Sequence, residues 1–464
     1  MSLAARLTLI ASLGCSLPAQ SYEQLFQEAA AATARADWST AAARYEAALK
    51  MRPSSVEARS NLGVVHYSSG RYAEAEATLR PLERTQRRLM PVQLILGLSR
   101  VRLGRYAEAV APLEQALRVD EQNRDATLGL ASALVGLERL DEAARIYQRH
   151  LAANQKDPEA WYALGVCSER LAEAETRKLS RLREGQAWAK RFLGEYWLER
   201  GNLALAQEAL TEAARLEPEQ NGLDALLDEA MRRSNARTPF EPWTAPAATA
   251  TEGESAEAIY GRARAWSEKA REAFQRFVEL APDSWQAHLF LGDLARQRRD
   301  FPEAIRQYEA AARNMEKPGA ALLGLGTVYW ELADDEKAIR YLEEARKTNP
   351  RSEQAAFALG NIAVRQRRDA EAAGLLEECL RLAPDHLGAH ADLGKAYAHL
   401  ERWAEAVPHL RRARAIDTYG EIHFQLYRAL SKLEQEEGAK EALEESKRIR
   451  AAQQERERRL KLLE

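Results

Sequence analysis

A fixed spacing between small residues constrains this chain more than any other feature of its sequence. Two series, Gly63, Gly97, Ala131 and Gly165, and later Gly292, Gly326, Gly360 and Gly394, advance by 34 residues from each member to the next. An alanine follows twelve residues behind each member of the later series, at Ala304, Ala338, Ala372 and Ala406. A repeat of this length predicts helix pairs that stack into a solenoid. Such a fold has no single core that could hold a buried active site, and it offers a long surface for binding instead.

Residues 319–352 show how one repeat is expected to fold. Apolar side chains at helical spacing form a single stripe, which consists of Leu322, Leu325, Tyr329 and Leu332. Gly326 lies inside that helix, where glycine costs about 1 kcal/mol relative to alanine. We therefore expect a second helix to approach closely there, with the small residue Ala338 on its inner side. Pro350 ends the second helix, because proline cannot continue the hydrogen-bond ladder.

This pattern resembles the tetratricopeptide repeat. The matching residues are Trp161 with Leu164 and Gly165, Leu393 and Gly394 with Tyr397, Trp403, Ala406 and Ala413, and Tyr45 with Ala48 and Pro53. The resemblance covers about twelve units, which begin near residues 22, 56, 90, 124, 158, 187, 251, 285, 319, 353, 387 and 421. It implies an all-α fold, a right-handed α-solenoid of stacked helix-turn-helix repeats.

The regular series break in the middle of the chain. Gly165 and Gly194 are only 29 residues apart, and we interpret residues 169–185 as a degenerate, charged second helix. Five segments are expected: a signal peptide at 1–19, an N-terminal repeat block at 20–233, a linker at 234–254, a C-terminal repeat block at 255–439 and a charged capping helix at 440–464. The linker carries Phe240 and Trp243 among prolines, so it is either a surface connector or an extended segment that docks in a groove.

The first residues differ in composition from the rest. Arg6 precedes an apolar run at 7–13, and Ala19 follows as a cleavage position, which is typical of a secretory signal peptide and predicts an extracytoplasmic location. One alternative is an ordinary N-terminal helix of a cytoplasmic protein. Another is a lipid anchor on Cys15, which is less favoured because Ser12 stands where an aliphatic residue is needed. No later segment reaches the roughly 18 apolar residues that span a bilayer, so no transmembrane segment is expected after cleavage.

Charge and cysteine content exclude several classes of partner and scaffold. The net charge is −3 and the isoelectric point is near 6.3, so there is no basic excess to attract nucleic acid. Cys167 and Cys379 lie two hundred residues apart in an array that keeps distant repeats separate, so we expect small buried side chains rather than a disulfide.

The resemblance implies a partner-binding groove, because the first helix of each pair lines the concave face in this family. In the N-terminal block the groove positions are apolar: Leu94, Ile95, Leu98, Val101, Leu128, Tyr162 and Val166. In the C-terminal block the groove positions are more polar and include Asp293, Asn361 and Lys395, with the aromatic residues Phe290, Trp330 and Phe357 interleaved. Some family members grip a peptide carboxylate with lysine and asparagine here. Phe357 stands where that pattern requires lysine, so this binding mode is not expected.

We expect no catalytic group, cofactor or metal. The sequence lacks a phosphate-binding glycine loop. It also lacks the metal-binding motifs HExxH and CxxC. His386 and His390 are four residues apart, but a third ligand is missing for a metal site. The leading hypothesis is a non-enzymatic scaffold that holds a partner protein or peptide in the groove. The alternative is a component of cell-envelope or polysaccharide assembly that bridges other proteins or contacts a glycan, an analogy at the level of the fold.

Overall fold

The computed structural model describes residues 21–182, 185–217, 220, 222–236, 255–316 and 318–461. In these ranges the secondary structure consists of 23 α-helices and two short 3-10 helices, without a strand. The all-α array of helix pairs expected from the repeat is thereby confirmed. The expected signal peptide at 1–19, with Cys15, and residues 237–254 of the expected linker lie outside the described residues. No described helix is both long enough and apolar enough to cross a membrane.

The helices group into two compact units, which are described separately. The first lies within Met1–Phe192 and Trp243–Leu280, and the second within Leu193–Pro242 and Ala281–Glu464. The first unit contains α1 (Tyr22–Ala34), α2 (Trp38–Met51), α3 (Val56–Ser68), α4 (Tyr72–Leu79), η1 (Arg80–Leu82), α5 (Met90–Arg102), α6 (Tyr106–Val119), α7 (Arg124–Gly136), α8 (Leu140–Ala153), α9 (Pro158–Arg181) and α13 (Ala256–Leu280). The second contains α11 (Leu203–Leu216), α12 (Leu223–Ala236), α14 (Trp285–Gln297), α15 (Phe301–Asn314), α16 (Gly319–Glu331), α17 (Asp335–Thr348), α18 (Glu353–Arg365), α19 (Asp369–Leu382), α20 (Leu387–His399), α21 (Trp403–Ala413), η2 (Arg414–Ile416), α22 (Glu421–Lys432) and α23 (Glu436–Lys461). Helix α10 (Gln186–Glu199) crosses the division.

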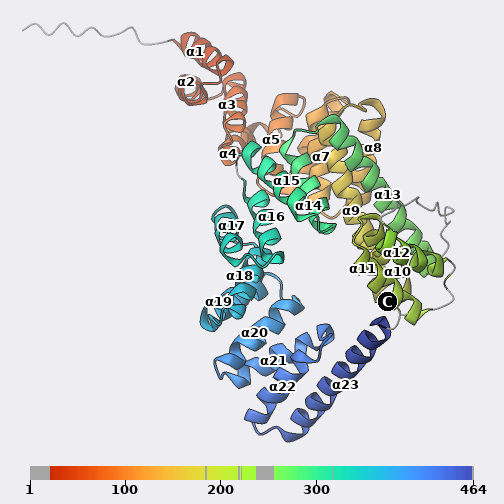
Figure 1. Cartoon of the computed structure of the whole chain (residues 1–464). Helices are drawn as coiled ribbons and strands as arrows, with labels where there is room; N and C mark the ends of the chain where they lie inside the picture. Colours follow the sequence, from red (N-terminus) through yellow and green to blue (C-terminus); the bar gives the residue numbers. More distant parts are fainter. Residues whose placement is uncertain are drawn as a thin grey trace, which may run out of the picture. The chain divides into compact units, whose positions relative to one another are not determined.

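The pair formed by α16 and α17 shows the regular packing (Figure 1). A Cβ atom added to Gly326 would lie 2.7 Å from Leu342 Cγ, which is closer than carbon atoms approach. Leu342 is fully buried, so the glycine allows the close approach predicted from the sequence. The same contact at the same spacing of sixteen residues recurs in other pairs, at Gly63–Leu79, Gly97–Leu113, Gly292–Tyr308, Gly360–Leu376 and Gly394–Leu410.

The fifth repeat departs from this scheme. A separate second helix expected at 169–185 is wrong, because α9 continues through those residues to Arg181. The helix continues because its buried face does: Leu171, Glu175 and Leu179 keep helical spacing, and no glycine or proline interrupts them.

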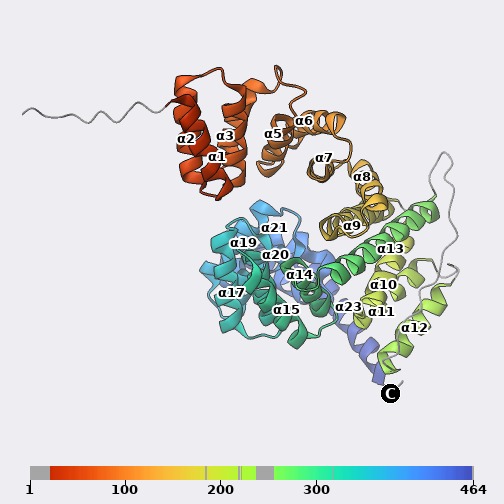
Figure 2. The ribbon, with the colours of Figure 1, turned by 90° about the horizontal axis from the view of Figure 1, so that it is seen from above.

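The partner of α9 is α13, which lies beside it along its length (Figures 1 and 2). The two helices are antiparallel, because Tyr162 near the start of α9 contacts Phe274 near the end of α13, whereas Glu175 pairs with Arg262 at 2.7 Å. A Cβ atom on Gly165 would lie 2.8 Å from the Phe274 ring. Phe274 therefore takes the place that Leu342 takes in a regular pair, although the chain between Gly165 and Phe274 is far longer than in a regular repeat.

The fifth repeat is thus split, and its two helices are separated in the chain by an insertion. The insertion contains a regular pair of its own, α10 and α11, in which Gly194 meets Leu210 after sixteen residues. Helix α12 packs against α11 through Leu223 and Ala230. The sequence places residues 255–280 with the C-terminal block, whereas the structure places α13 in the first unit. The physical reason is that Phe274 and Phe277 pack against Tyr162 of α9.

Helix α23 packs against α22 at the end of the second unit. Ala439, Ala442 and Ser446 are buried against α22, and the Ser446 hydroxyl donates to the carbonyl oxygen of Gly420 at 2.6 Å. The helix begins at Glu436, a few residues before the capping segment expected from the charge pattern, because Gln435 and Ala439 already close its first turn. The polar outer face is that of a capping helix.

Candidate functional site

In the first unit, four of the predicted groove residues form a half-buried apolar stripe on the first helices. Leu94, Leu98 and Val101 of α5 and Leu128 of α7 pack at the edge of the core formed by α6 to α9. Leu98 reaches across to α7, where a Cβ atom on Gly129 would lie 2.6 Å from Leu98 Cδ2. The stripe therefore serves packing between neighbouring first helices and leaves part of each side chain exposed.

Two of the predicted groove residues pack inside the first unit instead of facing a groove. Ile95 is 9% exposed and packs in the core with Leu79 and Leu96, so it belongs to the packing rather than to the exposed face. The Tyr162 ring lies 6.0 Å from the Phe274 ring and 5.0 Å from the Phe277 ring of α13, measured between centroids. Val166, one turn further along α9, is half-buried. The second helix of the split repeat thus covers the ring that was expected to contact a partner.

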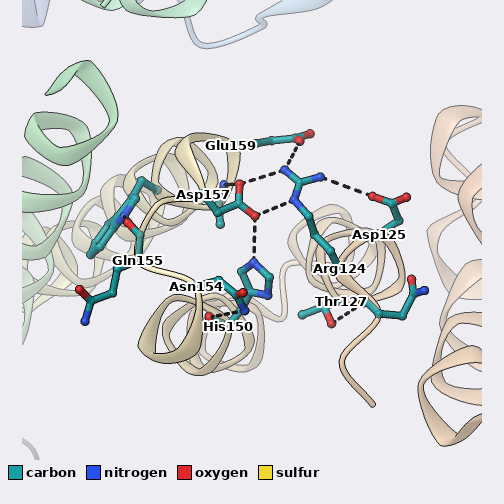
Figure 3. A network of polar contacts seen from close by, with 11 residues as sticks. Arg124, Asp125, Thr127, His150, Asn154, Gln155, Asp157 and Glu159 are labelled. Atoms are coloured by element: carbon teal, nitrogen blue, oxygen red, sulfur yellow. Dashed lines mark hydrogen bonds and ion pairs between the residues drawn. The ribbon is translucent and has the colours of Figure 1, made fainter. Parts of the chain in front are cut away.

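A polar network holds the start of α9 against α7 and α8 (Figure 3). Asp157 caps α9 by accepting from the backbone N–H of Ala160. The same carboxylate accepts from Arg124 Nε at 2.7 Å and lies 2.9 Å from His150 Nε2. Arg124 also pairs with Glu159 at 2.7 Å. The network joins three helices, and Asp157 within it is only 8% exposed.

This network predicts a loss of stability in acid. Burial alone would raise the pKa of Asp157, but the bonds from Arg124 and His150 outweigh it and lower the pKa from 3.8 to about 2. A carboxyl group whose pKa is lowered by folding stabilises the fold at pH values above its pKa in the unfolded state. This stabilisation disappears as the pH falls toward 2. Between pH 5 and pH 2 we expect the first unit to lose about 2 kcal/mol through this group alone. The check is urea unfolding of the protein and of its Asp157→Asn variant. The free energy of unfolding of the asparagine variant should lack the part of the pH dependence that comes from Asp157. An equal pH dependence in the two proteins would contradict the role of this carboxylate.

In the second unit, several predicted residues are brought into contact across three consecutive first helices. Trp330 Nε1 on α16 donates to Asn361 Oδ1 on α18 at 2.9 Å, and Asn361 Nδ2 donates to Asp392 Oδ2 on α20 at 2.6 Å. Lys395 Nζ lies 3.6 Å from the other oxygen of Asp392. Phe357 meets Trp330 edge to face, with 5.7 Å between the ring centroids. We call these five residues the α16–α20 platform.

The platform is ordered by its own bonds. Asn361 uses its carbonyl oxygen and its amide nitrogen for contacts to two other helices, which fixes the orientation of the side chain. Asp392 is 7% exposed, whereas Trp330, Phe357, Asn361 and Lys395 are half-buried. The arrangement presents two aromatic rings beside one carboxylate and one ammonium group.

The remaining predicted residues of the second unit lie one helix pair earlier. Phe290 is half-buried on α14. Asp293 on the same helix is exposed and accepts a hydrogen bond of 2.7 Å from the Tyr308 hydroxyl of α15. The carboxylate is thus bonded within its own helix pair, and its contact to Tyr308 could not be read from the position of Asp293 on the first helix alone.

The histidine pair considered as a metal site has other roles. His386 Nδ1 accepts from the backbone N–H of Ala389 and caps α20. His390 is bonded to Pro384 and to His409, a residue that the sequence reasoning did not consider. Among the described residues, no group of three histidine, cysteine or carboxylate side chains could hold a metal ion.

Comparison with known proteins gives matches to two models of the tetratricopeptide repeat, one over residues 101–167 and the other over 26–84, 267–321, 323–386 and 357–421. The matches stop in α9 and resume in α13, on either side of the insertion. No curated protein was found to match the chain.

Solved structures similar to the chain include MamA from Desulfovibrio magneticus RS-1, at 20% identity over 37% of this chain and 97% of that one, with a TM-score of 0.33. They also include the APC/C hetero-tetramer Cut9-Hcn1, at 16% identity over 92% and 94% with a TM-score of 0.35. A third is Pseudomonas aeruginosa pilF, at 18% identity over 40% and 85% with a TM-score of 0.36.

Proposed function

Since the chain belongs to the tetratricopeptide repeat family, we propose that it is a non-enzymatic scaffold that binds a segment of a partner protein on the α16–α20 platform. The observation that carries this proposal is the chain of contacts from Trp330 through Asn361 to Asp392, which crosses three helices. A surface that is already ordered loses little side-chain entropy on binding, so its contacts contribute more fully to affinity.

The side chains of the platform indicate the chemistry of the partner. Trp330 and Phe357 offer large apolar rings with few rotatable bonds, which is typical of residues that dominate binding energy. Lys395 and Asp392 stand beside them and can meet polar groups of a peptide backbone or side chain. Asn361 is already bonded on both sides, and Phe357 replaces the lysine of a carboxylate clamp. We therefore favour an internal segment with one large apolar anchor over a chain terminus.

The apolar stripe of the first unit, Leu94, Leu98, Val101 and Leu128, is a second proposed contact for the same partner or another one. Its side chains are half-buried, and aliphatic side chains have less apolar surface to bury than the aromatic rings of the platform. We expect it to extend an interface rather than to anchor one.

A peptide selection tests the platform. Binders to the whole protein would be selected from a library of displayed random peptides. The tightest binder would be synthesised, and its Kd would be measured by fluorescence anisotropy. Trp330→Ala should weaken binding by about 2 kcal/mol, or roughly 30-fold in Kd, because it removes the larger anchor ring. Tyr419→Ala is the matched control, because Tyr419 is an aromatic residue that is 64% exposed and stands outside the platform.

Three outcomes would contradict the proposal. One is a set of selected peptides that bind Trp330→Ala as well as they bind the unchanged protein. Another is an equal loss with Tyr419→Ala. Binding of an envelope glycan in place of any peptide would favour the alternative role in envelope assembly.

A further inference from the structure

A pair of histidine rings joins α20 to α21 behind the platform. His390 Nδ1 and His409 Nδ1 lie 2.8 Å apart, and His390 Nε2 lies 3.0 Å from the carbonyl oxygen of Pro384. His390 is 7% exposed and His409 is half-buried. The rings are therefore bonded to each other on a largely buried side of the helix pair.

The bonds fix which nitrogen of each ring carries its proton. A carbonyl oxygen only accepts, so His390 Nε2 must donate to Pro384. In a neutral ring the other nitrogen is then an acceptor, so His409 Nδ1 donates to His390 Nδ1. One added proton places a charge at this buried contact. When both rings are protonated, two N–H groups face each other across this short contact and the bond cannot be kept.

Charged side chains of α19, the α20–α21 turn and α21 lie near the pair, among them Glu405, four residues before His409 on α21. Glu377 of α19 faces His409 and accepts a bond from the Tyr397 hydroxyl of α20 at 2.6 Å. Arg402 stacks on the Tyr397 ring at 4.3 Å. Burial first and His390 second lower the pKa of His409, and Glu377 opposes them only in part.

Further titratable and charged groups lie at the ends of these two helices. His386 caps α20, and Asp385 with Arg412 forms an ion pair at the exposed ends of α20 and α21. This ion pair lies at the surface, so it does not offset a charge at the buried contact between the rings.

The same helix carries a side of the platform. Asp392 and Lys395 lie on α20, shortly after His390. The His386 ring lies 4.4 Å from the Phe357 ring, measured between centroids. A shift of α20 against α21 would therefore move Asp392 relative to Asn361 and open the chain of platform contacts.

We propose that His390 and His409 form a proton-sensitive joint, which holds α20 in place for the platform at neutral pH and releases it in mild acid. Only the consequence for binding rests on the proposed function. The joint itself is a property of the helix pair. A lowered histidine pKa means that the folded state binds fewer protons than the unfolded state below pH 6.5, so the stability of this pair falls as the pH falls.

Another helix pair of this chain joins its two helices at the equivalent positions without two histidines. In α14 and α15 the same two repeat positions hold His288 and Gln307, and His288 Nδ1 lies 2.7 Å from Gln307 Oε1. A glutamine at this position can therefore maintain the bond between the two helices. His390→Gln with His409→Gln should keep a hydrogen bond between the two side chains and remove both imidazole rings.

Amide hydrogen exchange on the full chain tests the joint without any ligand. After correction for intrinsic rates, opening of α20 and α21 should rise between pH 7.5 and pH 5.5, by at most about tenfold, because one ring changes the opening equilibrium by no more than tenfold per pH unit. Helices α16 and α17, which contain no histidine, are the internal control. The double glutamine variant should show no excess. An equal rise in both regions, or the same rise in the variant, would overturn the proposal.

Two further measurements on the same protein keep the proposal testable if the double variant does not fold. Nuclear magnetic resonance titration of the ring protons of His409 should give a midpoint below that of a free histidine, and a normal midpoint would overturn the joint. The indole N–H resonance of Trp330, assigned with Trp330→Phe, should shift with the same midpoint, because the bond to Asn361 depends on α20. An unchanged resonance would remove the link to the platform and leave the peptide experiment unaffected.

Discussion

Replacing Phe274 by alanine is expected to destabilise the first unit by about 3–5 kcal/mol, the cost of removing a buried aromatic ring from a core. Phe274 is 4% exposed and fills the space above Gly165 and beside Tyr162. Because the ring belongs to the second helix of the split repeat, its loss should weaken α9 although the two helices are far apart in the chain. Urea unfolding would measure the change in free energy, and hydrogen exchange of α9 would show where it acts.

Two matched variants give this result its meaning. Leu342→Ala changes the equivalent position of an uninterrupted repeat and should cost a comparable amount, about 2–5 kcal/mol. Arg181→Ala changes the residue that stands sixteen positions after Gly165, where an uninterrupted fifth repeat would place its core residue. Arg181 is exposed, so its replacement should cost less than about 0.5 kcal/mol. A large effect of Arg181→Ala with a small effect of Phe274→Ala would contradict the split.

The regular repeats could be predicted because the residues that contact each other in a helix pair lie within the same repeat unit. Gly326 and Leu342 are sixteen residues apart, and both are visible in one short stretch of the sequence. The split repeat could not be predicted in the same way. Phe274 and Phe277 stand at second-helix spacing, but nothing in the local pattern of α13 states that its first helix lies before the insertion. Order in the chain predicts that α9 pairs with the residues that directly follow it, and this prediction is wrong.

The candidate site shows the same limit on a smaller scale. Repeat position indicates that Trp330, Phe357, Asn361 and Lys395 face one side of consecutive first helices, and the structure brings these four side chains together. Ile95 shows the opposite case, because one residue turns a helix by about 100°, enough to move a side chain from the exposed face into the core. The bonds of Asn361 depend on rotamers and on neighbours in other repeats.

Replacing Arg100 is expected to cause the second large loss of stability. The contacts of this side chain also explain how the helix array continues across the irregular connection between α4 and α5. Helix α4 is short and ends in η1, because Pro81 stands where a second helix would continue. Arg100 of α5 contacts Glu76 at 3.1 Å and Glu83 at 2.7 Å, and it donates to the carbonyl oxygen of Glu108 at 3.0 Å. The side chain thus joins α4, the connection and α6. Arg100→Met should cost about 3–5 kcal/mol, because it leaves the buried carboxylate of Glu76 without its buried partner.

A double variant separates the ion pair from simple packing. Glu76 is 5% exposed, and its only other charged contact among the described residues is Arg105, whose side chain is 52% exposed. Replacing both Arg100 and Glu76 by methionine removes the charge that the single variant leaves unpaired, and the apolar side chains fill a similar volume. Buried ion pairs replaced as a whole are often neutral in stability. The double variant should therefore unfold at a higher urea concentration than Arg100→Met alone. If it unfolds at a lower concentration, then the arginine acts through its shape and its bond to the Glu108 carbonyl, and the charge of Glu76 is not what makes Arg100 necessary.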